Sequence, residues 1–125
     1  MQRILFAIFT LLIVCCNKKN EVTFSHWNVT KVEGPAAGNA NQAIALTVYW
    51  PYGSGSCDVL DKFEETREGN IIYIKAYGHV TSGVCTMDAG IKTKIYNFFS
   101  ASTGTFELRF VNRDNTFISH TIIII

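Results

Sequence analysis

Carboxylates are concentrated in one short stretch of the chain: Asp58, Asp61, Glu64, Glu65 and Glu68. Clustered acids of this kind can bind Ca²⁺, which takes about six to eight oxygen ligands at one point. On an extended strand, however, Glu64 and Glu68 lie on one face and Asp61 and Glu65 on the other. We therefore interpret the stretch as a solvated strand whose charges discourage pairing with another chain, and we predict no metal site.

Aromatic residues form a second candidate site, in the segment Tyr49-Trp50-Pro51-Tyr52 together with Trp27 elsewhere in the chain. A sugar ring presents an apolar face that stacks on such rings and hydroxyl groups that bond to their polar tips. Trp50 continues the apolar alternation of residues 44–50, so we expect it to lie in the core. Tyr49 and Tyr52 are then expected to face outward, and they are the candidate ligand surface.

The remaining reactive side chains do not form a catalytic motif. His26, His79 and His120 fall in three different predicted elements, and no nucleophile or acid motif accompanies them. Ser54 lies among glycines, but it lacks the apolar helix that follows the nucleophile of a Gly-x-Ser-x-Gly turn. The glycine-rich segments also lack the lysine of a phosphate-binding loop. We predict no catalytic residue, no cofactor and no enzymatic activity.

The N-terminus has the pattern of an export signal. One basic residue, Arg3, precedes the run from Ile4 to Val14, which is apolar except for Thr10. A secretory signal has such a charged start and an apolar run of roughly 7–15 residues, whereas a membrane-spanning helix needs about 20. We therefore predict that residues 1–15 are a signal peptide that is removed from the mature protein.

The end of this run, Ile13-Val14-Cys15-Cys16, resembles the lipobox of bacterial lipoproteins. In that family an aliphatic residue lies three positions before a cysteine, and the cysteine becomes the first residue of the mature chain and receives a diacylglycerol on its sulfur. Cys16 fits this pattern, with Ile13 as the aliphatic residue. Cys15 is the alternative, with Leu12 as the aliphatic residue and the bulkier Val14 directly before it.

The resemblance implies a location as well as an anchor. In the sorting rule of such lipoproteins, an aspartate directly after the lipidated cysteine retains the protein in the inner membrane, whereas Asn17 occupies that position here. The expected location is therefore the outer membrane, facing either the periplasm or the cell exterior. Two acyl chains are enough for stable attachment to the membrane, and the polar residues 16–21 would serve as a tether.

The charge of the mature chain is balanced. Without residues 1–15, it carries ten basic and ten acidic side chains. Nucleic-acid binding requires clustered positive charge, so we expect no nucleic-acid partner.

Two cysteines, Cys57 and Cys85, follow the N-terminal pair. In an oxidising compartment such a pair is most simply a disulfide. A zinc site would need more ligands at short spacing, and His79 is the only histidine near either cysteine in the sequence. We predict a Cys57–Cys85 bridge, which contributes about 3.5 kcal/mol in the chain-entropy model.

The rest of the chain has the pattern of seven strands separated by turn residues. The segment 58–68 would also fit a helix, but Gly69-Asn70 is a tight-turn pair that favours a hairpin with the strand after it. Seven predicted strands and no predicted helix indicate an antiparallel two-sheet β-sandwich. The predicted strands are 22–32, 44–50, 58–68, 71–77, 91–100, 106–110 and 117–125.

The last third of the chain adds a resemblance. Residues 102–110, a polar turn and then residues 121–125 resemble the last two strands of bacterial immunoglobulin-like domains. This resemblance implies an immunoglobulin-like sandwich over residues 22–125. Together with the lipobox, the chain looks like the small exported lipoproteins of Bacteroidota, which implies a fold and a location but no activity.

The closing residues Ile122–Ile125 are isoleucine on both faces of the last strand. An uncovered strand of this kind would be prone to aggregation. We expect the N-terminal strand of the domain to bury it, and docking of a partner by strand addition is the alternative.

The expected function is that of a lipid-anchored, non-enzymatic binding or structural module at the outer membrane. Its expected partners are the membrane, through the lipid on Cys16, and a protein or glycan of the envelope. Two alternatives stay open. The chain would be a surface glycan-binding protein if Tyr49 and Tyr52 hold a sugar. It would be a small hydrolase inhibitor if the Gly53–Ser56 loop beside Cys57 enters an active site.

Overall fold

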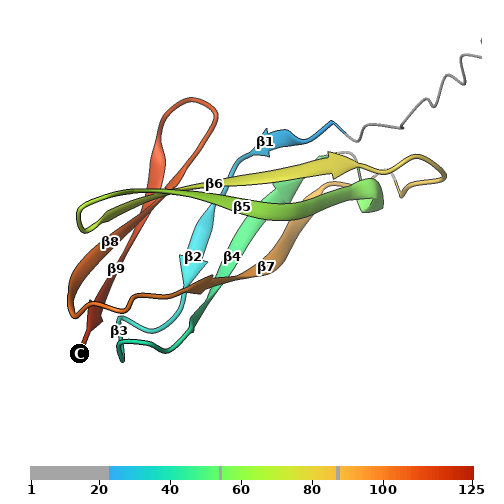
Figure 1. Cartoon of the computed structure of the whole chain (residues 1–125). Coiled ribbons are helices and arrows are strands. Elements are labelled where there is room, and N and C mark those ends of the chain that lie inside the picture. Colours follow the sequence, from blue (N-terminus) through green and yellow to red (C-terminus); the bar gives the residue numbers. More distant parts are fainter. Residues whose placement is uncertain (1–22, 54, 87) are drawn as a thin grey trace, which may run out of the picture.

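The computed structural model describes residues 23–53, 55–86 and 88–125, and the predicted signal peptide, Cys16 and the tether lie outside them. In this part of the chain nine strands form two sheets that pack face to face, with one short 3₁₀ turn at Gly55–Cys57 (Figure 1). This confirms an all-β, two-sheet sandwich. The strands are β1 (Ser25–Trp27), β2 (Lys31–Glu33), β3 (Ala37–Gly38), β4 (Ile44–Tyr52), β5 (Asp58–Glu68), β6 (Ile71–Val80), β7 (Gly90–Phe98), β8 (Gly104–Val111) and β9 (Phe117–Ile124).

The larger sheet is organised around β6. One edge of β6 pairs with β5 along its whole length. Its other edge pairs with β1 near its end, where Ser25 lies opposite Gly78, and with β8 near its start, where Ile71 lies opposite Glu107. β9 follows β8, and the short β3 closes the sheet. The smaller sheet has the order β2-β4-β7.

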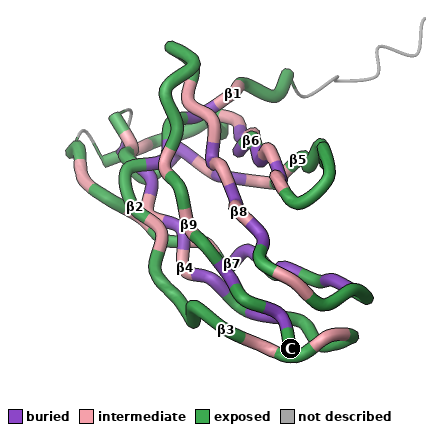
Figure 2. The backbone as a smooth tube through the Cα atoms, turned by 90° about the vertical axis from the view of Figure 1, so that its left-hand side faces the viewer, coloured by how far each residue is buried: buried purple, intermediate pink, exposed green. Residues whose placement is uncertain are grey.

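The core lies between the two sheets and follows the alternation of the strands. The backbone tube alternates between buried and less buried residues along β8 and β9 (Figure 2). On β4 the residues Ile44, Leu46, Val48 and Trp50 are all buried, as their spacing predicted. Alternating burial of this kind is what a strand with one face on the core requires.

The acidic segment forms β5 and makes a hairpin with β6, which confirms the hairpin rather than the helix. Gly69 adopts a φ of 59° in the connecting turn, a conformation that is open to glycine at little cost. The pairing is interrupted by a register shift between Leu60 and Lys62, so Asp61 is the extra residue of a β-bulge.

The predicted strand over residues 22–32 is wrong, because the chain changes sheets within it. β1 joins the larger sheet and β2 the smaller one. Val29 lies buried between them, and its N–H donates to Oδ1 of Asn112 at 2.8 Å. The N–H of Thr30 donates to the carbonyl of Tyr49 at 2.9 Å. These distant partners satisfy the backbone at the crossing, and short-range periodicity cannot reveal them.

The sandwich is also not antiparallel throughout, since β6 pairs with β8, and β3 with β9, in parallel. The first case follows from the β5–β6 hairpin. β5 and β6 run in opposite directions, and it is β6 that lies next to β8. If β5 lay there instead, the pair would be antiparallel.

The closing isoleucines are covered on one face and at one edge. Ile122 and Ile124 are buried, whereas Ile123 is 51% exposed on the outer face. The N–H of Ile123 donates to the carbonyl of Ala36 at 2.9 Å, and that of Ile125 to the carbonyl of Gly38 at 2.9 Å. The short strand β3 therefore pairs with this edge but leaves the outer face exposed, so the prediction that the N-terminal strand buries the last strand is wrong.

Among the described residues, none forms a helix with the length and hydropathy to cross a membrane.

Candidate functional site

An open pocket of about 410 Å³ lies at the end of the sandwich where β1 begins and β6 ends. Its volume falls within the usual range of small-ligand sites, roughly 300–1,000 Å³. Four separate parts of the chain supply its lining residues. The C-terminal residue, Ile125, lies at the opposite end of the molecule (Figure 1). The lining residues that bear rings or polar groups include Ser25, Trp27, Asn28, Tyr52, Asp58 and Arg113.

The apolar wall of the pocket is aromatic. Trp27 packs edge-on against Trp50 with ring centroids 4.8 Å apart, and Trp50 lies 6.5 Å from Tyr52. Trp50 and Tyr52 lie on the same face of β4, because they are two positions apart along the strand. Trp50 is buried in the core, whereas Tyr52 lies one step further out and is partly exposed to the pocket. The Lys92 ammonium lies 4.7 Å from the Tyr52 ring centroid.

The polar wall combines a carboxylate with the β8–β9 turn. Asp58 is 5% exposed, and its Oδ2 accepts the N–H of Gly53 at 3.0 Å. Oδ1 of Asn28 accepts the N–H of Arg113 at 3.0 Å, and Nε of Arg113 donates to the carbonyl of His26. These bonds attach the turn to the β1–β2 crossing, so the cation of Arg113 is held at the pocket.

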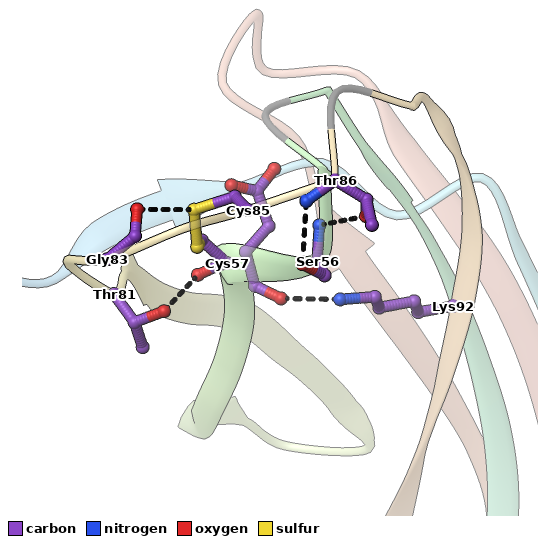
Figure 3. The surroundings of a disulfide bond; sticks show 8 residues. Ser56, Cys57, Thr81, Gly83, Cys85, Thr86 and Lys92 are labelled. Atoms are coloured by element: carbon purple, nitrogen blue, oxygen red, sulfur yellow. Dashed lines mark hydrogen bonds between the residues drawn. A yellow bond between two sulfur atoms is a disulfide. The ribbon is translucent and has the colours of Figure 1, made fainter.

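A disulfide between Cys57 and Cys85 holds the long loop after β6 against the start of β5, as the sequence predicted (Figure 3). Their Cα atoms are 5.4 Å apart, a normal separation for a disulfide. Beside the bridge, Ser56 and Thr86 exchange two bonds: each backbone N–H donates to the other hydroxyl, at 3.2 and 3.0 Å. The N–H of Thr81 donates to the carbonyl of Cys57 at 2.8 Å.

The same loop reaches the pocket through Tyr52. The hydroxyl of Tyr52 donates to Oδ2 of Asp88 at 3.4 Å. Hydrogen bonding by Thr86 is the main cause that lowers the pKa of Asp88, so this carboxylate is ionised at neutral pH and accepts the bond. The disulfide loop therefore helps to orient the one predicted ligand residue that lines the pocket.

The structure does not bring the two predicted tyrosines together. Tyr49 lies on the outer face of β4, where its hydroxyl donates to Oε2 of Glu33 at 2.7 Å. The bond to Glu33 raises the pKa of Tyr49, while the bond to Lys31 lowers the pKa of Glu33. Tyr49 thus belongs to a surface ion-pair cluster on the face opposite to Tyr52.

The three histidines bond to three different partners. Nδ1 of His79 lies 2.5 Å from Oδ2 of Asp61 at the β-bulge. Nε2 of His26 lies 2.7 Å from the carbonyl oxygen of Val111, and Nε2 of His120 lies 3.0 Å from that of Pro35. Within the described ranges, no three His, Cys, Asp or Glu side chains are placed to hold a metal ion together.

Sequence reasoning missed Asn28 and Arg113 as site residues, and it considered Asp58 only as a member of the acidic cluster. They belong to different turns and strand ends, and none forms a motif with its neighbours. A signal was nevertheless present, because successive strands of a sandwich alternate in direction and return alternate turns to the same end. Counting strand ends would have grouped the turn after β4 with that after β8.

Comparisons with family models, with curated proteins and with solved structures found no match for this chain.

Proposed function

We propose that this chain is a lipid-anchored protein of the bacterial envelope that binds a saccharide, without catalysis, in the pocket at the disulfide end. The observation that carries this proposal is the pairing of aromatic rings with fixed polar groups around one open pocket. A sugar ring needs both, since its C–H face is apolar and its rim carries hydroxyls.

Each wall of the pocket has a role in this proposal. Tyr52 and Trp27 contact the apolar face of the sugar. Asp58 accepts from sugar hydroxyls, while Arg113 donates to them. Oδ2 of Asp58 already accepts the N–H of Gly53, and Nε of Arg113 already donates to the carbonyl of His26, so both side chains lose little freedom when the ligand binds.

The position of the N-terminus supports an envelope saccharide as the ligand. The first residue of β1, Ser25, lines the pocket. If Cys16 carries the lipid, the segment 16–24 reaches at most about 30 Å when fully extended. The pocket is then held near the membrane surface, where the glycans of the envelope itself are concentrated.

For the fold, we propose a variant of the immunoglobulin-like sandwich. Its strand orders β2-β4-β7 and β6-β8-β9 correspond to the A-B-E and C-F-G orders of that fold. The departure is the extra strand β5, which precedes the strand in the C position and accounts for the parallel β6–β8 pair.

The anchor is tested by mass spectrometry of the membrane fraction. We expect a diacylglyceryl-modified N-terminus that is lost in Cys16→Ala. The alternative anchor, Cys15, is examined with Cys15→Ala, which should retain the lipid if Cys16 carries it. A wild-type chain recovered as a soluble, unmodified protein would contradict the anchor.

Saccharide binding is tested on a glycan array with the full chain solubilised in detergent. Tyr52→Ala should abolish binding to the glycan that the wild type retains. Tyr49→Ala is the matched control, since it removes the same side chain from the same strand on the opposite face. Equal losses in both variants, or no wild-type binding to any envelope glycan, would refute the proposed function.

A further inference from the structure

A second cavity, of about 230 Å³, opens between β5 and β7. The two strands belong to different sheets, and in the described part of the chain each pairs with a neighbour on one side only. The cavity is lined by Trp50, Leu60, Lys92 and Lys94, and by Asp58, which also lines the saccharide pocket. Two ammonium groups and one carboxylate leave this lining with a positive charge.

Both lysines lie on the inner face of β7. They are an even number of positions from Tyr96 and Phe98, which are buried, so all four side chains lie on the core side of the strand. Lys92 donates to the backbone carbonyl of Asp58 at 2.9 Å and lies 5.6 Å from the Trp50 ring centroid. Lys94 is half-buried, and among the described residues it has no hydrogen-bond acceptor or ion-pair partner.

The indole N–H of Trp50 is an independent observation. Trp50 is 3% exposed, and within residues 23–53, 55–86 and 88–125 its Nε1 has no hydrogen-bond acceptor. A buried donor without an acceptor costs about 1–3 kcal/mol, and such groups are rare in folded proteins. The ladder places Trp50 opposite Lys92 and Val48 opposite Lys94, so the indole and both ammonium groups belong to one end of the β4–β7 pair.

We propose that this cavity binds an oxyanion group, the phosphate or carboxylate of a small molecule, through Lys94, Lys92 and the indole N–H of Trp50. Inward-pointing lysines also protect a sheet edge from pairing with another chain. That role accounts for the lysines but not for a buried indole donor that lacks an acceptor. An oxyanion accounts for both, because it accepts several hydrogen bonds and neutralises the ammonium charge.

Asp58 contributes one negative charge to this lining, against the two positive charges of the lysines. Its Oδ2 accepts the N–H of Gly53, and the Lys92 ammonium donates to its backbone carbonyl. The site differs from the saccharide pocket in its ligand chemistry and in the lysines that define it. The inference therefore does not rest on the proposed function.

The test uses the two indole N–H signals of the full chain in ¹H–¹⁵N NMR spectra, since the chain has two tryptophans. Sodium phosphate and sodium acetate are titrated separately at constant ionic strength, with chloride as the replaced anion. We expect a saturable shift of the Trp50 indole signal with at least one of the two. Lys94→Gln should weaken that binding about tenfold or more, because a hydrogen bond to a charged group contributes about 1.5–3 kcal/mol.

Two further variants make the result decisive. Lys75→Gln removes an exposed lysine of β6 and should leave the titration unchanged. Lys94→Arg keeps the positive charge and should retain anion binding. This variant tests the role of the charge even if Lys94→Gln fails to fold. Phosphate binding alone identifies a phosphate-bearing ligand, and acetate binding alone a carboxylate. The absence of a saturable shift with either anion, or equal affinity in wild type and a folded Lys94→Gln, would overturn the proposal. Loss of glycan binding in Tyr52→Ala reports on the other pocket and is read separately.

Discussion

At the scale of single residues, the tyrosines differ in burial and in hydrogen-bond partner, and Tyr96 is the buried one. Tyr96 is 4% exposed and packs edge-on against Phe63 and Phe110, with centroids 5.3 and 5.5 Å away. Its hydroxyl donates to Oε1 of Glu65 on β5. Burial, and then the bond to Glu65, raises the pKa of Tyr96, so the hydroxyl stays protonated and remains a donor.

We therefore predict that Tyr96→Phe lowers the free energy of unfolding by about 1 kcal/mol, the usual net contribution of one hydrogen bond. Tyr49→Phe breaks a similar bond to Glu33 on the solvent-exposed face, where such pairs contribute less than about 1 kcal/mol and often nothing measurable. Urea unfolding measures both. Equal effects of the two substitutions would argue against a special role for the buried bond between the sheets.

Glu107 predicts a dependence of stability on pH. Its carboxylate accepts from Arg109 at 2.9 Å and from the hydroxyl of Ser119 at 3.0 Å. The bond from Arg109, followed by that from Ser119, lowers the pKa of Glu107 below its ordinary value of 4.5. Since the folded pKa is the lower one, this stabilisation is present above the unfolded pKa and is lost as the pH falls through the folded value.

Thermal unfolding between pH 6 and pH 3 measures this effect. Below about pH 4.5 the midpoint of the wild type should fall more steeply than that of Glu107→Gln, which has no carboxylate to protonate. Glu68→Gln, at the exposed end of β5, is the matched control and should keep the steeper wild-type slope. Parallel curves for wild type and Glu107→Gln would show that this cluster does not contribute.

At the scale of elements, the pairing of β5, β6 and β1 requires a glycine at one point. Gly78 lies opposite Leu60 beside the β-bulge and opposite Ser25 on the other edge. A Cβ atom at Gly78 would collide with the carbonyl oxygen of Val59, which is backbone and cannot move aside as a side chain can.

Gly78→Ala should therefore destabilise the protein by about 1–3 kcal/mol, as overpacking of a well-packed site does. At Gly53 an added Cβ meets nothing within 4 Å, so Gly53→Ala is a control with a much smaller expected effect. Differential scanning calorimetry of both variants compares them. A Gly78→Ala protein as stable as Gly53→Ala would mean that the bulge relaxes without cost.

The elements show where sequence patterns are informative. Alternation predicted β4 and its buried residues, and Gly69-Asn70 predicted the β5–β6 hairpin, because both depend on neighbours along the chain. The switch between β1 and β2 was not predictable in this way, since its backbone is satisfied by Asn112 and Tyr49, far away in the sequence. The same alternation also places Tyr52 on the face of Trp50 and Tyr49 on the other, so treating the two tyrosines as one surface overlooked the period of the strand.

At the scale of the whole molecule, the candidate binding pocket and the disulfide lie at the same end of the sandwich. The start of β1, the end of β4 and the β8–β9 turn supply lining residues of the pocket, and the disulfide loop reaches it through the bond between Tyr52 and Asp88. The sequence predicted the bridge between Cys57 and Cys85 from their number and the expected compartment. It did not predict that the bridge lies beside the pocket, because this depends on which strand ends the fold brings together.

The disulfide provides the last prediction, because it links stability to the shape of the pocket. Its two cysteines are 28 positions apart, so the chain-entropy model assigns it about 3.5 kcal/mol. Cys57→Ser combined with Cys85→Ser should lower the free energy of unfolding in urea by roughly that amount. The double variant keeps both side-chain sizes close to those of the wild type, and dithiothreitol treatment of the wild type should reproduce its effect.

The consequence for binding follows from the bonds beside the bridge. Without it, the loop that carries Thr86 and Asp88 is held to Ser56 and Tyr52 by hydrogen bonds alone, so Tyr52 is less well oriented. We expect the double variant to bind the glycan retained by the wild type more weakly while still folding at low temperature, since pre-organisation contributes to affinity. Glycan titrations of the folded double variant at 10 °C measure this separately from stability. Unchanged glycan affinity would mean that the disulfide stabilises the fold but does not shape the pocket.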